Sequence, residues 1–220
     1  MVLEKDIKEI SPKEVSKYQE VHWFAGIGGF SLGLHWARWS LPIWTGGFPC
    51  QDISCAGTGE GLSGKRSGLW WEWLRLIKAC RPVRLLIENS PILRSRGADE
   101  VLDSLEEIGY TCWPIVVGAV HVGAPIKRSR SFTVAVTDKI VGKTRVRFSK
   151  HLQGGEKGVP KTVGQRFDVN KWGLDSAPRI SRMDARIPAR VDRLEQLGNS
   201  VCPHVVKAIA EAWLKAENHV

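Results

Sequence analysis

The sequence lacks any uninterrupted apolar run of the roughly 18 residues that a membrane-spanning helix requires. Residues 1–20 are charged and lack the apolar core of a secretory signal peptide. The five cysteines include no CxxC pair and are odd in number, which argues against a zinc site and against a disulfide framework. There is also no internal repeat or low-complexity tract. We therefore expect a soluble cytoplasmic protein with reduced thiols and no bound metal.

The 220 residues suit one domain with a small appendage and leave no room for a second full domain. The net charge of +9 has a local origin. Residues 127–193 hold 17 Lys and Arg against 6 Asp and Glu, whereas the rest of the chain holds 15 and 17. One basic segment on a nearly neutral body is typical of a surface that binds a polyanion. A solvated basic face without a partner is the alternative.

A glycine-rich turn follows the first predicted strand, residues 21–24. Glycines stand at 26, 28, 29 and 33, and an apolar pattern then predicts a helix. Strand, glycine turn and helix together bring backbone N–H groups and a helix N-terminus to a ligand. The spacing does not match GxGxxG, so a purely structural turn is an equal alternative.

Two polar groups follow two further predicted strands. Residues 41–44 lead into the loop 46–54, which carries Cys50, and the predicted parallel strand 83–87 is followed directly by Glu88. Because the carboxyl ends of parallel strands share one edge of a sheet, we expect these groups to lie close together. Taken alone, Cys50 fits a buried structural cysteine better, because that is the commoner role of a lone cysteine.

Local patterns predict the remaining elements. Ser11 is a candidate N-cap for a short N-terminal helix with Pro12 at its first position and Glu14 in its first turn. Ser67 is a candidate cap for the next helix, whose apolar stripe reads as core. The other predicted elements are a helix at 99–108, a hairpin of strands 110–117 and 131–136, and a closing helix from about 203 to 217.

The turn of that hairpin carries Arg128 and Arg130. A thiolate, a carboxyl with a raised pKa and guanidinium groups together suit addition to an electron-poor ring. A cysteine hydrolase would instead need a histidine base near its thiol. Histidines at 22, 35 and 121 show no recognisable pairing with Cys50, which makes that reading a weak alternative.

Five blocks of the chain resemble the motifs of the DNA cytosine-C5 methyltransferases, especially compact phage and bacterial members, and they occur in that family's order. The blocks are FAGIGGF at 24–30, GGFPCQDIS at 46–54, ENS at 88–90, GAP at 123–125 with RSR at 128–130, and RL at 193–194 through GNSV at 198–201. The resemblance implies a reduced Rossmann-like α/β sheet of the S-adenosylmethionine-dependent type, with a small target-recognition insertion.

The resemblance also implies a mechanism. Cys50 would add to carbon 6 of a cytosine flipped out of duplex DNA, and Glu88 would assist at N3. Arg130 would hold the base's O2, with Arg128 supporting the carboxyl or the backbone, while the Gly57–Gly64 loop closes over the base. The S-adenosylmethionine site would include residues from both ends of the chain: Phe24, Gly26, Gly28, Gly29, Asn199 and Ser200.

Several features depart from the family pattern. Only the 16 residues from Phe30 to Thr45 separate the glycine turn from the Pro-Cys block, where the family places two more strands with an acidic and a polar cofactor ligand. His22 stands where the family usually carries Asp, and Ile126 occupies the first position of its QxRxR pattern. We expect the first strand to be an exposed edge and hypothesise that the catalytic side is kept while the cofactor side is weakened.

The chain then divides into a lead-in at 1–20, a catalytic core at 21–136, a recognition segment at 137–177 and a C-terminal return at 178–220. Two functions fit this organisation. One is an active methyltransferase of restriction-modification or phage type in a bacterial cytosol, with a second chain able to complete the cofactor site. The other is a catalytically impaired relative that binds duplex DNA.

Overall fold

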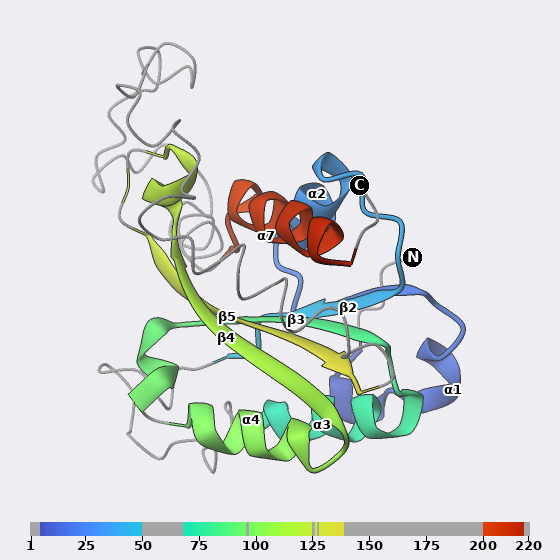
Figure 1. Cartoon of the computed structure of the whole chain (residues 1–220). Helices are drawn as coiled ribbons and strands as arrows, with labels where there is room; N and C mark the ends of the chain where they lie inside the picture. The colour runs from blue at the N-terminus through green and yellow to red at the C-terminus, as the bar shows by residue number, and fades with distance from the viewer. Residues whose placement is uncertain are drawn as a thin grey trace, which may run out of the picture.

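The computed structural model describes residues 5–49, 68–95, 97–124, 126, 128–138 and 200–217, and within them five strands form one sheet with helices on both faces (Figure 1). The strands are β1 (Glu20–Trp23), β2 (Ile43–Gly46), β3 (Arg84–Asn89), β4 (Tyr110–Gly118) and β5 (Ser129–Thr137). Their order is β1-β2-β3-β5-β4; the first three are parallel, and β5 runs antiparallel to both β3 and β4. The α/β prediction is confirmed.

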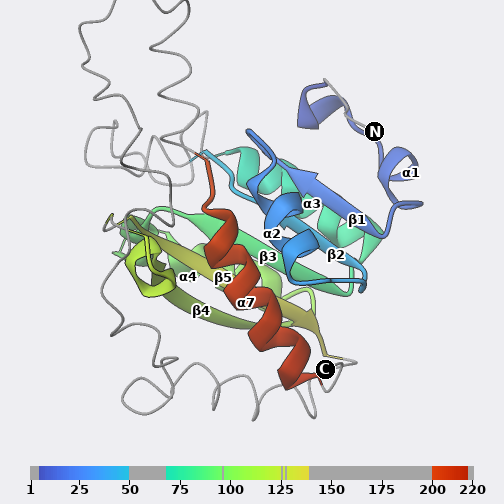
Figure 2. The same cartoon turned by 90° about the horizontal axis from the view of Figure 1, so that it is seen from above.

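Helices cover both faces of this sheet. α2 (Gly29–Trp36) and α7 (Pro203–Ala216) pack side by side on one face (Figure 2). On the other face lie α3 (Leu69–Cys80) and α4 (Ala98–Glu106), with the short helices η1 (Ile7–Glu9) and α1 (Pro12–Val15) beside α3. Two short 3-10 helices, η3 (Pro91–Ser95) and η4 (Ala119–Val122), complete the described part.

Each face of the sheet has its own hydrophobic core. α3 contributes Trp70 and Trp73 to one core, and both side chains are fully buried. α7 contributes Val206 and Trp213 to the other. Because both faces are covered, all six residues of β3 are buried, including the charged Arg84 and Glu88. Among the described helices, none combines the length and apolarity needed to cross a membrane.

Strand boundaries differ from expectation where strands pair. β2 begins at Ile43 and includes Gly46, which was expected in the loop. β3 continues through Asn89 because it pairs with β5, so Glu88 lies inside the strand and opposite Phe132. Pairing with β4 extends β5 back to Ser129, so that Arg130 lies in a strand instead of the hairpin turn. Strand pairing therefore holds both charged residues more rigidly than a turn would.

The observed helix boundaries agree more closely with those predicted from the sequence. Ser11 caps α1, with Pro12 at the first position and Glu14 bonded back to the Ser11 N–H at 2.8 Å, as predicted. The cap position of α3 is Gly68, one residue after the expected Ser67, which lies outside the described residues. α4 spans 98–106, about two residues short of the predicted end, and α7 follows its prediction closely.

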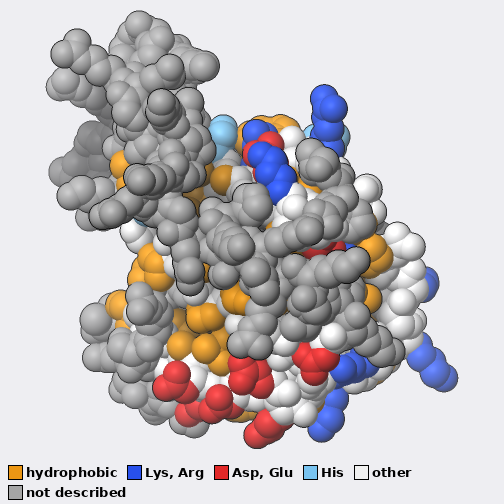
Figure 3. All heavy atoms as spheres, viewed as in Figure 1, with side chains coloured by type: hydrophobic (Ala, Val, Ile, Leu, Met, Phe, Trp, Pro, Cys, Tyr) orange, Lys and Arg blue, Asp and Glu red, His pale blue; other side chains and the backbone are white. Residues whose placement is uncertain are grey.

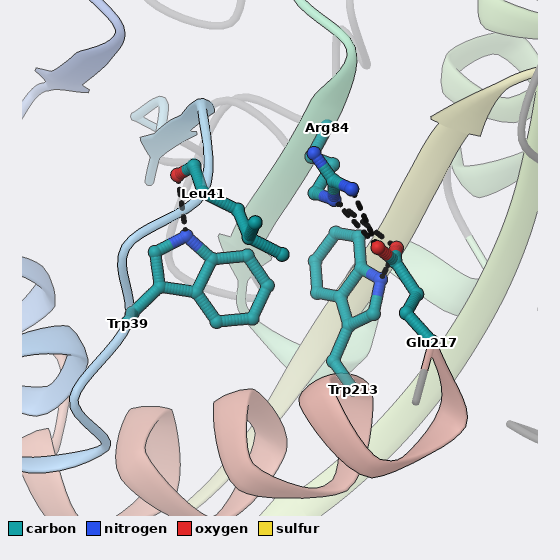
Figure 4. A network of polar contacts seen from close by, with 5 residues as sticks. All are labelled: Trp39, Leu41, Arg84, Trp213 and Glu217. Carbon is teal, nitrogen blue, oxygen red and sulfur yellow. Dashed lines mark hydrogen bonds and ion pairs between the residues drawn. The ribbon is translucent and has the colours of Figure 1, made fainter. Parts of the chain in front are cut away.

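A buried ion pair ties the C-terminal end of α7 to the start of β3 (Figure 4). Arg84 Nε lies 3.1 Å from each carboxylate oxygen of Glu217, and the two side chains are only 7% and 3% exposed. Trp213 donates its indole N–H to the same carboxylate at 2.7 Å and packs against Trp39. This network fastens segments that lie 133 residues apart in the sequence.

Candidate active site

The buried carboxyl of Glu88 is the centre of the candidate site. Glu88 Oε1 lies 3.0 Å from Arg130 Nε, so the two groups form an ion pair between neighbouring strands β3 and β5. Glu88 is 8% exposed, whereas the Arg130 side chain is 25% exposed and reaches toward solvent. The structure thus brings together two of the predicted site residues.

Burial changes the acidity of this carboxyl. Desolvation raises the pKa of Glu88 from 4.5 to about 7, in opposition to the positive charges of Arg130 and Arg128, which favour the carboxylate. Glu88 can therefore hold or release a proton near neutral pH. This property suits a general acid.

The raised pKa predicts how Glu88 affects stability. Between pH 4.5 and 7 the folded protein keeps a proton that the unfolded chain has released, so this group makes the free energy of unfolding fall as pH rises. We expect Glu88→Gln to lack this contribution. Urea denaturation gives the unfolding free energy of both proteins at each pH. The value for the wild type minus the value for Glu88→Gln should fall by roughly 3 kcal/mol between pH 4 and pH 8.

Glu100→Gln is the matched control, since Glu100 is an exposed carboxylate in the first turn of α4. Its curve of unfolding free energy against pH should run parallel to that of the wild type. A Glu88→Gln curve that also runs parallel would contradict the raised pKa.

The loop that enters Cys50 is held beside Glu88. A Cβ on Gly47 would lie 2.7 Å from Glu88 Oε2, so only glycine leaves the carboxyl in place. Asn89 donates its side-chain N–H to the Phe48 carbonyl at 3.1 Å, while its amide oxygen accepts from the Ser90 N–H at 2.8 Å. The chain is therefore anchored next to the carboxyl two residues before Cys50, which itself lies outside the described residues.

Arg128 connects the β5 side of the site to the C-terminal segment. Its guanidinium donates to the Ser200 carbonyl at 2.6 Å, and the Arg128 carbonyl accepts from the Ala119 N–H at 2.9 Å. The predicted cofactor residue Ser200 thus contacts the site through its backbone carbonyl, which binds Arg128. Its neighbour Asn199, and the Gly57–Gly64 loop, lie outside the described residues.

Two of the described cysteines are poor nucleophiles. Burial raises the pKa of Cys112 to about 12 and also raises the pKa of Cys80, so both remain protonated thiols at neutral pH. These two thiols are therefore unsuited to nucleophilic catalysis. Cys50 has the strand-end position that suits this chemistry.

The glycine turn leaves open space above its backbone. Phe24, Gly26 and Gly28 all have positive φ, at 52°, 53° and 84°, and the Gly28 N–H donates to the Ala25 carbonyl at 3.0 Å. Within the described part of the chain, a Cβ on Gly26 or Gly28 would meet no atom within 4 Å. Gly29 differs, because its Cβ would lie 2.4 Å from the Val201 carbonyl oxygen. The turn is thus packed on its inner side and free to receive a ligand on its outer side.

A cavity of about 660 Å³ adjoins this turn. Its lining includes Phe24, Ala25 and Gly26 of the turn, the whole of β1, and residues of the N-terminal lead-in. Sequence reasoning gave the lead-in no chemical role. Its apolar residues Ile7, Ile10 and Val15 indicate that the segment packs against the fold, but their local spacing does not predict which surface they contact.

Comparison with known proteins identifies the family. A family model described as C-5 cytosine-specific DNA methylase matches residues 40–177, more than half of the chain. The chain belongs to this family.

Curated type II methyltransferases are similar to this chain in sequence. The chain is 26% identical over 164 residues to the type II methyltransferase M.NgoBI of Neisseria gonorrhoeae, covering 56% of this chain and 52% of that protein. It is 27% identical over 210 residues to the type II methyltransferase M.SsoII of Shigella sonnei, covering 74% and 54%. The chain spans about half the length of these curated relatives.

The fold itself has a counterpart among solved structures. The Entamoeba histolytica methyltransferase EhMeth aligns with a TM-score of 0.56 at 12% identity, covering 89% of this chain and 97% of that one. The methylase-family match includes Cys50, Glu88 and both arginines, whereas the glycine turn precedes its first residue. The fold and the family thus rest on separate comparisons.

Proposed function

We propose that this chain is a DNA cytosine-C5 methyltransferase, which transfers a methyl group from S-adenosylmethionine to cytosine in duplex DNA. The observation that carries the proposal is the buried Glu88–Arg130 pair beside the anchored approach to Cys50. A protonatable carboxyl and a guanidinium at one sheet edge, with a thiol two residues along the chain from the anchored Phe48, match the functional groups along one side of a cytosine ring. Membership of the methylase family supports this choice of substrate.

The residues divide the chemistry as follows. The Cys50 thiolate forms a bond to carbon 6 of the cytosine; the C5=C6 electrons shift to make a C4=C5 double bond, and the C4=N3 electrons take up a proton from Glu88 at N3. Arg130 pairs with Glu88 and directs a further N–H toward the base's O2. Once carbon 5 is methylated, N3 returns its proton to Glu88. Loss of the carbon-5 proton to solvent then re-forms the C5=C6 bond, the bond to carbon 6 breaks, and Cys50 leaves as a thiolate.

S-adenosylmethionine, when bound, supplies the electrophilic methyl group. The open outer side of the turn at Gly26 and Gly28 fits such a ligand, because backbone can approach it where side chains are absent. Phe24 and Gly29 flank that opening, and Asn199 and Ser200 are the proposed contacts from the C-terminal segment.

The basic segment 127–193 would contact the DNA, because its Lys and Arg residues suit phosphate contacts. Acidic side chains gather over α4, at the lower edge in Figure 3, where they would repel the phosphate backbone. The target cytosine must leave the base stack to reach Glu88, at a cost of a few kcal/mol.

A second candidate is a relative that binds duplex DNA without methylating it. The 16-residue connection between the glycine turn and the Pro-Cys block favours this candidate, because it leaves no room for two further strands. A second chain that completes the cofactor side would restore the first function.

A trapping experiment distinguishes these candidates. Duplex DNA containing 5-fluorocytosine should form a covalent adduct with the chain in the presence of S-adenosylmethionine, seen as a denaturation-resistant shift on gels. Radiolabelled methyl transfer to unmodified duplex should accompany it. Tight DNA binding with neither adduct nor methyl transfer would favour the non-catalytic relative.

A further inference from the structure

The cavity beside the glycine turn runs along the outer edge of β1. In the described part of the chain β1 is the end strand of the sheet, so no further strand covers this edge. The cavity extends from Glu20, at the start of β1, to Gly26 in the turn. Its volume of about 660 Å³ lies within the range of small-molecule sites.

The outer wall of the cavity comes from the lead-in, which the structure describes from residue 5 onward; three of the five residues that it contributes to the lining are aliphatic, and the other two are Lys5 and Tyr18. Ile7 and Ile10 of this segment are buried, as is Val15 of α1, and all three line the cavity. Such a wall suits the flat face of a purine base. It occupies the side of β1 on which the family's additional strands would stand.

The lead-in is firmly held in this position. Arg75 of α3 donates to the carbonyls of both Ile7 and Ile10 at 3.1 Å, which fixes two turns of the segment at once. Ser11 and Glu14 close the capping box of α1, and Lys5 pairs with Glu14 at 2.7 Å. The wall is thus a preformed part of the fold.

The opposite side of the cavity is polar and carries an oriented carboxylate. Glu20 and His22 alternate with Val21 and Trp23 along β1, so they project to the face of the sheet that α2 covers. His22 Nε2 lies 2.8 Å from the Glu20 carboxylate, and His22 Nδ1 lies 2.7 Å from Thr45 Oγ1 on β2. The Glu20 side chain remains 43% exposed, so it keeps acceptor sites for a ligand.

We propose that this cavity binds the adenosyl part of the methyl donor, with the lead-in as its outer wall and Glu20 as the acceptor for the ribose hydroxyls. A carboxylate can accept hydrogen bonds from both hydroxyls of a ribose, and the apolar wall then faces the base. The lead-in thereby replaces the wall that the short connection after α2 cannot provide. The inference rests on the proposed function, since it assigns the donor site of that same reaction.

Calorimetric titration of the full chain with S-adenosylhomocysteine tests the proposal without turnover. We expect Glu20→Gln to weaken binding about tenfold or more, because a hydrogen bond to a charged group is lost. Glu9→Gln is the matched control: Glu9 is an exposed carboxylate of the same lead-in that does not line the cavity. Hydrogen exchange should also show that residues 5–18 gain protection when S-adenosylhomocysteine is added.

Gly28→Ala separates the possible failures, because its φ of 84° makes any side chain strained in the turn itself. One outcome would overturn the lead-in site and leave the proposed function standing. In it, Gly28→Ala weakens binding of S-adenosylhomocysteine, Glu20→Gln leaves that binding unchanged, and residues 5–18 gain no protection from hydrogen exchange. A wild-type chain that fails to bind S-adenosylhomocysteine at all would overturn both.

Discussion

Cys50→Ser should abolish methyl transfer to duplex DNA, with a loss of at least about a thousandfold, because a serine hydroxyl is a far weaker nucleophile than a thiolate at neutral pH. The covalent adduct with 5-fluorocytosine DNA should disappear as well. DNA affinity should stay close to that of the wild type, because the substitution leaves every Lys and Arg of the basic segment 127–193 in place. Methyl incorporation, adduct formation and a DNA-binding titration check the three expectations together.

Cys55→Ser is the matched control for this experiment. Cys55 lies five residues further along the same segment, and replacing it makes the same change of sulfur to oxygen. It should leave both methyl incorporation and adduct formation near the wild-type level. Equal losses in the two variants would mean that the segment is merely sensitive to substitution, and an adduct that survives in Cys50→Ser would remove Cys50 from the mechanism.

Glu217→Ala should cost roughly 3–5 kcal/mol of unfolding free energy, because it leaves the buried Arg84 guanidinium without its anionic partner. Glu217 follows the last residue of α7, so the substitution leaves the helix itself unchanged, and the loss reports the ion pair together with the Trp213 hydrogen bond to the same carboxylate. Urea denaturation at neutral pH measures this directly. Most of the stability should return in the double variant Arg84→Met/Glu217→Leu, which replaces both charges with apolar groups of similar size.

Glu211→Ala provides the comparison on the same helix. Glu211 pairs with Lys207 at 2.9 Å, but both side chains are well exposed, so its removal should change the stability by less than about 1 kcal/mol. Equal effects at positions 211 and 217 would show that burial does not decide the strength of the α7 ion pairs.

Elements with strong local signals were predictable from the sequence. The Ser11 cap with Pro12 and Glu14 specifies α1 through contacts within four residues, and the apolar spacing of 203–217 specifies α7. The hairpin of β4 and β5 was predicted to within two residues at each end. The convergence of Glu88 with Arg130 also followed from their places along the chain, because sheet topology brings strand ends to one edge.

Features that depend on distant partners were not predictable. Pairing with β5 extends β3 past Glu88, and no local pattern in residues 84–89 records that partner. Glu217 shows no sign in its own surroundings that it meets Arg84. The lead-in docks through Arg75, a residue more than 60 positions away, which is why a segment with ordinary helix signals also lines a cavity.

The close contact between Gly29 and Val201 links the glycine turn to the part of the site that contains Glu88 and Arg128. Ser200, next to Val201, accepts a hydrogen bond from Arg128, and the positive charge of Arg128 lowers the pKa of Glu88. A displacement of the glycine turn by a ligand would therefore shift Arg128 and change the proton affinity of the Glu88 carboxyl. By reciprocity, protonation of Glu88 would alter ligand affinity by the same factor. The absence of a side chain at Gly29, which allows this close contact, thus couples binding of the methyl donor to protonation of Glu88.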